Sequence, residues 1–454
     1  MYRDHRERFL EKLAESGCAA VIPTARHKVR NHDCEYRFRP TSDFWYLTGF
    51  EEPESVLVLL PEGIRKQDSD EEREGEPSGP VRSVLFLRDR DAKLETWTGR
   101  RLGVERAPAA LGVDEARPIS KLWDDLPGLL ADYQRIVYRL GADEVDDRGM
   151  IETLGRLRAK ARNGIEPPNE VVDPAPLLHE QRLFKSEAEL ALMRQAAQVT
   201  CAGHVAAMSV AEPGMREYEL EAIISHEFRR HGASGVAYET IVAGGENGCI
   251  LHYTENDAVM NDGDLVLIDA GSEHDYYACD VTRTFPVNGT FSLEQRAIYD
   301  LVLEAEMSAI EAVGPGVAFK TIHETALGVL VRGLIRLGLV EGTEEEVIEK
   351  ELYKPVFMHK TSHWMGLDVH DCGAYTTDGE SRVLEPGMVF TVEPGLYISE
   401  ENEDVDPRWR GIAVRIEDDI LVTANGYQVL TAAIPKTVEE VEAACGGRDL
   451  EPAI

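Results

Sequence analysis

The chain has 454 residues, of which 43% are hydrophobic, and its formal net charge at pH 7 is −35. A chain of this length and composition can bury a sizeable core and predicts two domains rather than one. Because so acidic a surface repels phosphate groups, nucleic acid and anionic membranes are not expected among its partners.

The seven cysteines are widely spaced and include no Cys-x-x-Cys pair. This pattern indicates a reducing compartment rather than a disulfide framework. The first residues, MYRDHRERFLEKLAESG, contain no continuous apolar run of the kind found in a signal peptide. The longest apolar stretch, residues 327–340, contains arginines and is too short to span a bilayer. We therefore expect a cytoplasmic protein without a membrane-spanning segment.

The first part of the chain reads as an α/β domain. Residues 1–17 have the periodicity of a helix, and CAAVIP (18–23) and SVLVLLP (55–61) are typical of strands. The charged segment 62–80 is expected to be a surface loop. The breaker-rich segment NGIEPPNEVVDPAP (163–176) predicts a linker, which places the domain boundary at residues 175/176.

The second part begins with helices, expected over about 185–210 and 217–231. The first of them carries a capping box, Ser186 with Glu189 three residues later. Strand signals follow through 265–287, and two more helices are expected across 293–340. From residue 383 onward, apolar and polar residues alternate in the manner of paired strands.

Two aspartates stand in the strand-like stretch LVLIDAGSEHDYYACDVTRTF (265–285). The turn-like GSEHD between them predicts an antiparallel hairpin with Asp269 and Asp280 nearly opposite each other. Two buried carboxylates at that separation repel and raise a pKa, unless a divalent cation lies between them. The alternative is structural, with one aspartate capping backbone groups at a strand end and the other paired with Arg283.

Three later segments add candidate ligands. VFMHKTSHWMGLDVHD (356–371) contains three of the 13 histidines of the chain, and TVEPG places Glu393 within an apolar strand. In AVRIEDDILV (413–422), alternation puts Arg415 and Glu417 on one face of a strand. An inward glutamate is costly unless it is paired, so Glu417 indicates either a metal ligand or an ion pair with Arg415.

Together these positions form one oxygen-rich set with a single nitrogen ligand. Such a set suits two hard or borderline divalent ions, such as Mn²⁺, Co²⁺ or Zn²⁺. It differs from a structural zinc site, which would be rich in cysteine. HKTSH also lacks the glutamate of the HExxH zinc-peptidase helix, which excludes that reading. The candidate metal ligands are Asp269, Asp280, His363, Glu393 and Glu417.

The order and surroundings of these residues resemble a known family. LIDAG, DVTRTF, SHWMGLDVHD, TVEPGLYI and RGIAVRIEDD are similar to motifs of the dinuclear "pita-bread" metallopeptidases, and among them of the bacterial Xaa-Pro aminopeptidases. The resemblance extends to RPTSDFWYLTGFEEPES (39–55), TWTGRRLG (96–103), HEQRLFKS (179–186) and GENGCILHYTEN (245–256). It implies a creatinase-like α/β domain over 1–175, for oligomerisation and substrate access, and a pita-bread catalytic domain over 176–454.

The resemblance also implies roles for the ligands. Asp280 and Glu417 would bridge two metal ions, usually manganese in the family. Asp269 would hold one of the ions, and His363 with Glu393 would hold the other.

Further residues match the family's substrate site. The implied catalytic residues are His252, His370, Glu393 and Arg415. The implied substrate-binding residues are His359, Tyr238, Tyr397, Asp43 and Trp97. His359 and Tyr238 would line a proline pocket, whereas Asp43 and Trp97 would reach the site of a neighbouring subunit, which implies a homodimer or homotetramer.

The expected chemistry is metal-assisted peptide hydrolysis. Two adjacent cations lower the pKa of a shared water, and the resulting hydroxide is expected to attack the scissile carbonyl, with Glu393 as general base. The resemblance implies release of the N-terminal residue from peptides whose second residue is proline. Two alternatives remain: a prolidase, which shares the fold and metals but accepts only dipeptides, and a metal-free binding module of the same fold.

Overall fold

The computed structural model describes residues 1–64, 80–131 and 133–446. The chain divides into two compact units, Met1–Gln181 and Arg182–Ile454. Most of the segment expected to be a charged surface loop, residues 65–79 of 62–80, lies outside the described residues. The domain boundary at 175/176 and the roles assigned to the two domains stay predictions.

Unit 1 is built on a six-stranded mixed sheet with the strand order β6-β5-β4-β1-β7-β8. Its strands are β1 (Cys18–Pro23), β4 (Val56–Leu59), β5 (Ser83–Leu87), β6 (Glu115–Pro118), β7 (Arg135–Val137) and β8 (Glu170–Val172), and β2 (Val29–Asn31) pairs with β3 (Cys34–Glu35) in a separate two-stranded sheet. The helices are α1 (Tyr2–Ser16), α2 (Ser42–Thr48), α3 (Ala92–Thr98), α4 (Ala107–Leu111), α5 (Leu122–Leu129) and α6 (Glu144–Ala159). The predicted first helix and the two predicted strands are present as α1, β1 and β4.

The expected linker over 163–176 is wrong in part, because residues 170–172 form β8. This strand pairs in parallel with β7 and lies at the edge of the sheet. An edge strand of three residues tolerates the prolines that flank it, since a proline is excluded only where its missing N–H is needed. The β-branched Val171 and Val172 favour the extended backbone between those breakers.

Among the described residues, unit 2 contains six complete α-helices and part of a seventh, and four of them are those that the sequence predicts over 185–210, 217–231 and 293–340. The six complete helices are α8 (Glu187–Val210), α9 (Glu217–Arg230), α10 (Leu293–Glu311), α11 (Phe319–Leu337), α12 (Glu344–Glu349) and α13 (Val438–Gly446), and the short α7 (Glu180–Leu183) contains the boundary between the units. The predicted capping box is confirmed, because Ser186 and Glu189 exchange side-chain and backbone hydrogen bonds at the start of α8. Within the described part of the chain, no helix is both long and apolar enough to cross a membrane.

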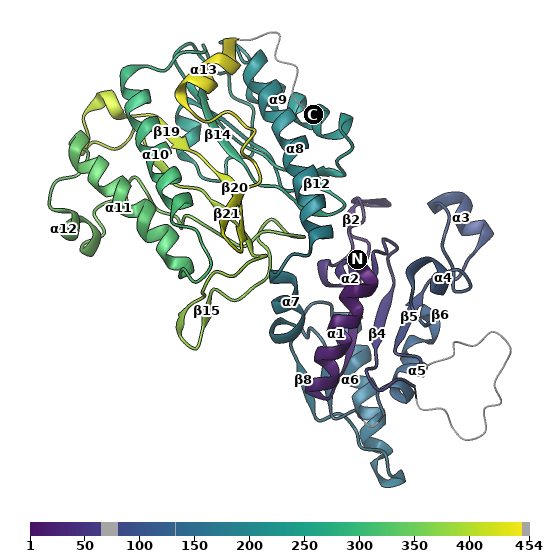
Figure 1. The fold of residues 1–454 in the computed structure, drawn as a ribbon. Helices are drawn as coiled ribbons and strands as arrows, with labels where there is room; N and C mark the ends of the chain where they lie inside the picture. Colours follow the sequence, from purple (N-terminus) through teal and green to yellow (C-terminus); the bar gives the residue numbers. More distant parts are fainter. Residues whose placement is uncertain (65–79, 132, 447–454) are drawn as a thin grey trace. The chain divides into compact units, whose positions relative to one another are not determined.

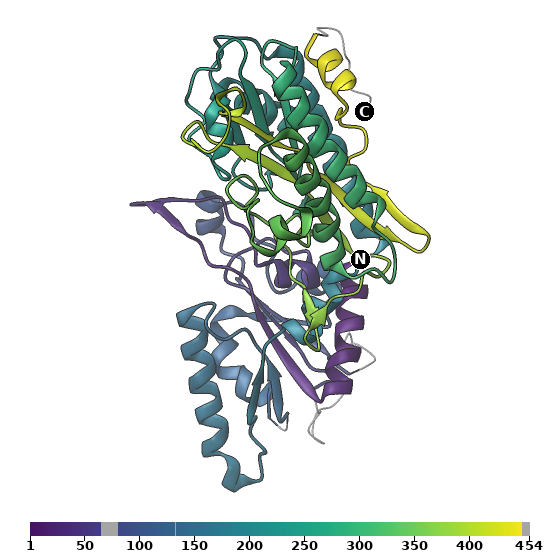
Figure 2. The same ribbon diagram turned by 90° about the vertical axis from the view of Figure 1, so that its left-hand side faces the viewer.

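The strands of unit 2 form several short antiparallel sheets. They are β9 (Gly235–Val236), β10 (Ile241–Gly244), β11 (Leu265–Asp269), β12 (Ser272–His274), β13 (Tyr277–Ala278), β14 (Thr282–Pro286), β15 (Thr376–Thr377), β16 (Glu380–Ser381), β17 (Val389–Val392), β18 (Gly395–Ile398), β19 (Ile412–Arg415), β20 (Asp418–Thr423) and β21 (Gly426–Val429). Helices α8 and α9 pack together, as do α10 and α11, and both pairs contact the strands (Figures 1 and 2).

The alternating segments after residue 383 pair as strands, as predicted, but the partners change at a proline. Residues before Pro394 form β17, which pairs with β20, and residues after it form β18, which pairs with β19. Glu393 lies at this break between the two ladders. A proline cannot donate to a ladder, so it ends one strand and fixes the position of the glutamate before it.

A network of buried charges lies behind these strands. The Arg283 and Asp418 side chains are both fully buried, and Arg283 Nη2 donates to Asp418 Oδ1 at 2.8 Å. Lys436 Nζ donates to Asp418 Oδ2 at 2.7 Å and to Glu306 Oε1 at 2.8 Å. Burial and the charge of Asp418 raise the pKa of Glu306 to about 8, against the opposing charge of Lys436.

Glu306 therefore makes stability depend on pH. Above its ordinary pKa, the unfolded chain releases a proton that folded Glu306 keeps, so stability falls as pH rises from about 5 to about 8. We expect Glu306→Gln to reduce this fall by more than about 1.4 kcal/mol, the equivalent of one pKa unit. The effect is measured by urea unfolding of the parent protein and of Glu306→Gln, in the presence of a chelator and at several pH values across this range. Parallel curves for the two proteins would contradict it.

Candidate metal centre

A cavity of about 540 Å³ lies within unit 2. Its lining includes all five predicted metal ligands and five further predicted site residues. It is lined by Tyr238, Glu239, Ile241, Leu251, His252, Thr254, Asp269, Asp280, His359, Lys360, Ser362, His363, Val369, His370, Glu393, Arg415 and Glu417. Side chains that are spread over nearly 180 positions of the sequence thus line a single cavity. Such a cavity with several convergent polar groups is typical of a binding or catalytic site.

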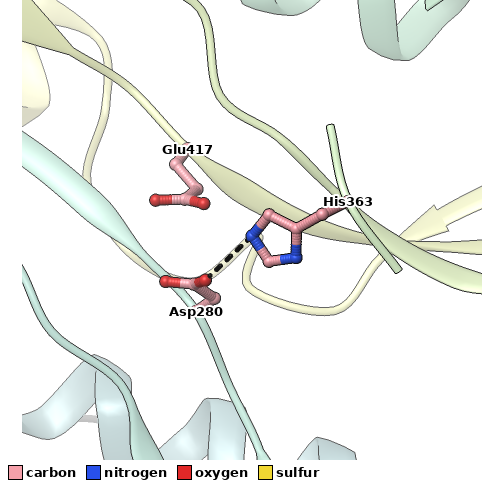
Figure 3. A group of neighbouring side chains, drawn as sticks. All are labelled: Asp280, His363 and Glu417. Carbon is pink, nitrogen blue, oxygen red and sulfur yellow. Dashed lines mark ion pairs between the residues drawn. The ribbon is translucent and has the colours of Figure 1, made fainter. Parts of the chain in front are cut away.

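Three of the predicted ligands can hold a metal ion as they stand. One ligand atom from each of Asp280, His363 and Glu417 lies within 4.8 Å of the other two (Figure 3). His363 Nε2 is 3.3 Å from Asp280 Oδ2. Asp280 and Glu417 are only 5% and 2% exposed, so both carboxylates are removed from solvent.

The other two predicted ligands flank this group. Glu393 Oε1 lies 3.5 Å from His363 Nε2. Asp269 is joined to Asp280 by the Tyr238 hydroxyl, which lies within hydrogen-bond distance of both carboxylates and shares its single proton between them. The second oxygen of Asp269 accepts from Arg415 Nη2 at 2.7 Å. The five side chains are thus neighbours in one cavity, and Asp269 is held by two protein donors.

The expected pairing of the two aspartates is wrong in its register. Strands β11 and β14 are antiparallel, but Asp269 faces Thr282 rather than Asp280. The residues between the strands are not a simple turn, because β12 and β13 pair in a separate sheet with β9. An offset of two residues keeps a side chain on the same face of a strand, which is why the two carboxylates still meet.

The buried carboxylates of this cluster favour the binding of positive charge. Burial raises the pKa of Asp269 and Glu417 and raises that of Glu393 to about 7. Burial alone would lower the pKa of His363, but its hydrogen bond to Asp280 and the nearby carboxylate charges raise it to about 9. Without cations, the cluster thus retains protons. Four carboxylates and one imidazole fit divalent metal ions, which would replace those protons.

Two threonines donate hydrogen bonds to candidate ligands, and neither was predicted from the sequence. Thr282 Oγ1 donates to Glu417 Oε2 at 2.6 Å. Thr391 Oγ1 donates to Glu393 Oε1 at 3.2 Å. Because side chains two residues apart in a strand share a face, Thr391 could have been identified from Glu393, whereas the partner of Thr282 comes from a different strand.

The arginine and tyrosines around the cluster are linked to one another. Arg415 is 4% exposed and donates to Asp269, to Thr282 Oγ1 at 2.9 Å and to the Tyr397 hydroxyl at 3.0 Å. The Tyr397 hydroxyl also contacts His359 Nε2 at 2.9 Å. Arg415 therefore orients a predicted ligand, and these bonds leave few of its N–H groups free to contact substrate.

Tyr238 lines the cavity, and its hydroxyl lies within hydrogen-bond distance of Asp269 and Asp280, so its part in a proline pocket stays a prediction. We expect Tyr238→Phe to lower activity and metal affinity about 10- to 100-fold, since it removes the donor that joins the two carboxylates. Titration of the metal-free variant with Mn²⁺, followed by peptide turnover, measures both effects. Tyr218→Phe, at a side chain that is 48% exposed on α9, is the matched control. Unchanged affinity in Tyr238→Phe would contradict this role.

The remaining predicted site residues fall into two groups. His252 and His370 line the cavity, and the His370 ring meets the His363 ring edge-on at 4.4 Å between centroids. Asp43 and Trp97 belong to unit 1, where Asp43 contacts His179 Nε2 at 3.1 Å and Trp97 is 82% exposed. The catalytic and substrate roles of all four stay predictions.

Comparisons with known proteins agree with this geometry. Residues 191–424 match the model of metallopeptidase family M24, and residues 2–138 match the aminopeptidase P N-terminal domain. The Xaa-Pro aminopeptidase of Escherichia coli (strain K12) is 46% identical over 97% of this chain and 96% of its own length.

Solved structures extend the likeness to the whole fold. The aminopeptidase PepP of Pseudomonas aeruginosa is 49% identical, with a TM-score of 0.91 over 98% of this chain and 97% of that chain. A zinc-substituted E. coli aminopeptidase P, solved with product, has a TM-score of 0.89 at 46% identity and covers 98% of both chains. These matches confirm the predicted two-domain fold, with its pita-bread catalytic domain. The chain therefore belongs to metallopeptidase family M24 and joins that peptidase domain to an aminopeptidase P N-terminal domain.

Proposed function

We propose that the chain is a metal-dependent aminopeptidase that releases the N-terminal residue from peptides with proline in the second position. The observation that carries this proposal is the group Asp280, His363 and Glu417, placed with Glu393 and Asp269 in a single cavity. The similarity to proteins named Xaa-Pro aminopeptidase over nearly the full length supports the choice of substrate.

The same five residues are proposed as the ligands of two divalent ions, with Asp280 and Glu417 shared between them. When bound, such ions supply a nucleophile from water near neutral pH and polarise the scissile carbonyl. Glu393 is proposed to take up the proton of that water and to pass it to the leaving proline nitrogen as the C–N bond breaks. Its Oε1 accepts a hydrogen bond from Thr391 Oγ1 at 3.2 Å, which helps to hold the carboxylate in position.

Two histidines at the cavity wall are proposed to bind substrate. His252 and His370 are exposed side chains that line the cavity, so their ring nitrogens can donate to the carbonyl oxygens of an entering peptide. Arg415 is proposed to act indirectly, by orienting Asp269 and Tyr397 through its hydrogen bonds to them. His359 contacts Tyr397 and is proposed to line the pocket for the proline ring.

A two-peptide assay tests the function. The protein, loaded with Mn²⁺, is incubated with Gly-Pro and with Arg-Pro-Pro, and release of the first residue is measured. We expect cleavage of Arg-Pro-Pro, which is lost in chelator and restored by Mn²⁺. Cleavage of Gly-Pro alone would identify a prolidase instead. Well under one metal ion per chain after dialysis against Mn²⁺ would indicate a metal-free binding module.

Manganese as the metal, a homodimeric or homotetrameric assembly, and a cytoplasmic location belong to the same proposal. Manganese suits a site of four carboxylates and one imidazole. Seven cysteines without a disulfide, all of them among the described residues, suit a reducing compartment. Metal analysis of protein purified without added metal, and its mass by light scattering, test the first two points.

A further inference from the structure

One loop supplies four residues of the cavity wall. His359, Lys360, Ser362 and His363 all line the cavity. Thr361 points the other way, since it is fully buried and its hydroxyl contacts His323 Nδ1 at 2.7 Å. Two of the four, His359 and His363, belong to the site already described, whereas Lys360 and Ser362 have had no part in it.

The backbone of this loop is fixed directly after the lysine. The Glu393 N–H donates to the Thr361 carbonyl at 2.8 Å, and the His363 N–H donates to Thr391 Oγ1 at 3.1 Å. The Lys360 carbonyl itself contacts His359 Nδ1 at 2.8 Å. The position of the Lys360 Cα is thus tied to the candidate ligands, and the residue lines the cavity.

Both side chains are uncommitted. Across the described ranges, the Lys360 ammonium has no ion-pair or hydrogen-bond partner, although the cavity wall is rich in carboxylates. The Ser362 hydroxyl is buried and has no hydrogen-bond partner there either. Arg415, another cation of the wall, is occupied by Asp269 and Tyr397. The loop therefore offers a cation and a hydroxyl donor to something that enters the cavity.

The cavity has an inner and an outer end. The candidate ligands are mostly buried, whereas Lys360 is exposed and so lies toward the mouth. In an aminopeptidase only one residue precedes the scissile bond, so the first residue lies innermost and the residues after the proline extend toward the mouth. The acceptor that Lys360 and Ser362 would meet is thus on the far side of the proline.

We propose that Lys360 and Ser362 form a subsite for a carboxylate that lies beyond the second residue of the substrate. This inference rests on the proposed function and names its preferred substrate class. An ammonium with a neighbouring hydroxyl suits a carboxylate, which accepts charge-assisted hydrogen bonds. That carboxylate is either the C-terminus of a tripeptide or the side chain of Asp or Glu at the third position.

Two peptide pairs distinguish these sources in the Mn²⁺-loaded protein. Gly-Pro-Gly against Gly-Pro-Gly-NH₂ tests the terminal carboxylate, and Gly-Pro-Glu-NH₂ against Gly-Pro-Gln-NH₂ tests the side chain. We expect the charged member of at least one pair to have a KM about five- to tenfold lower, as befits one exposed ion pair with one added hydrogen bond. High salt should reduce the difference, because the lysine is exposed.

Variants assign the preference to the lysine. Lys360→Met should bring the KM ratio of that pair close to one, Lys360→Arg should keep the preference, and Lys360→Glu should reverse it. Lys320→Met is the matched control, since Lys320 is a 63% exposed side chain on α11 that pairs with Glu324. Equal KM values within both pairs, with the neutral peptides still cleaved, would overturn the subsite alone. If no peptide is cleaved, the proposed function fails and the subsite fails with it.

Discussion

Asp280→Asn is expected to abolish peptide cleavage and to reduce metal uptake to below two ions per chain. Asp280 is 5% exposed, lies 3.3 Å from His363 Nε2 and belongs to the group that can hold a metal ion as it stands. If it is shared between two ions, losing its charge weakens both of them. An effect of several kcal/mol on the barrier corresponds to a loss of kcat of at least about 1,000-fold.

Two measurements separate this effect from misfolding. Elemental analysis after dialysis against Mn²⁺ gives the metal content, and the circular dichroism spectrum checks the fold. Asp300→Asn is the matched control, because the Asp300 side chain is 54% exposed and pairs with Arg296 on the same helix. Turnover of Asp280→Asn within tenfold of the parent protein would contradict the shared-ligand role.

The chemistry of the site could be predicted because its residues violate the rules of a core strand. Acids at positions 269, 280, 393 and 417 stand in or beside apolar strands, and such positions are costly without a partner. The helices could also be predicted, since the capping box at Ser186 and the apolar periodicity are local properties of the sequence.

The register and the supporting contacts could not be predicted in the same way. The offset between Asp269 and Asp280 depends on β12 and β13, which leave the hairpin to pair with β9. The contact from Thr282 to Glu417 spans 135 residues of sequence. Such pairings are set by tertiary packing, and the alternation of residues within a single strand does not reveal them.

The case of Tyr238 shows a different limit. Its place in the cavity is consistent with the resemblance, but its hydroxyl is bound to two carboxylates 31 and 42 residues away. Lys360 and Ser362 show the converse, since they line the same cavity and nothing in the sequence distinguished them from their neighbours. A cavity wall includes residues of no unusual type, and only the fold identifies them.

Arg283→Met is expected to lower the free energy of unfolding by about 3–5 kcal/mol, the cost of leaving a buried ion pair without one partner. The Arg283 side chain is fully buried, and besides Asp418 it donates to the carbonyl of Glu417 at 2.7 Å and of Thr282 at 3.0 Å. Arg283 lies in β14, the strand that follows Asp280, and its bond to the Glu417 carbonyl connects this strand to the backbone of a second candidate ligand. Metal affinity should fall together with stability.

A double variant tests whether the loss of this ion pair is the cause. Arg283→Met with Asp418→Asn removes both charges, so it should recover part of the stability that the single change loses, whereas additive losses would contradict a charge effect. Arg296→Met provides the exposed comparison, because its side chain is 46% exposed beside Glu439, and such pairs contribute about 1 kcal/mol or less. Urea unfolding of the metal-free proteins isolates stability, and Mn²⁺ titration then shows whether the arginine that supports the fold also positions Glu417.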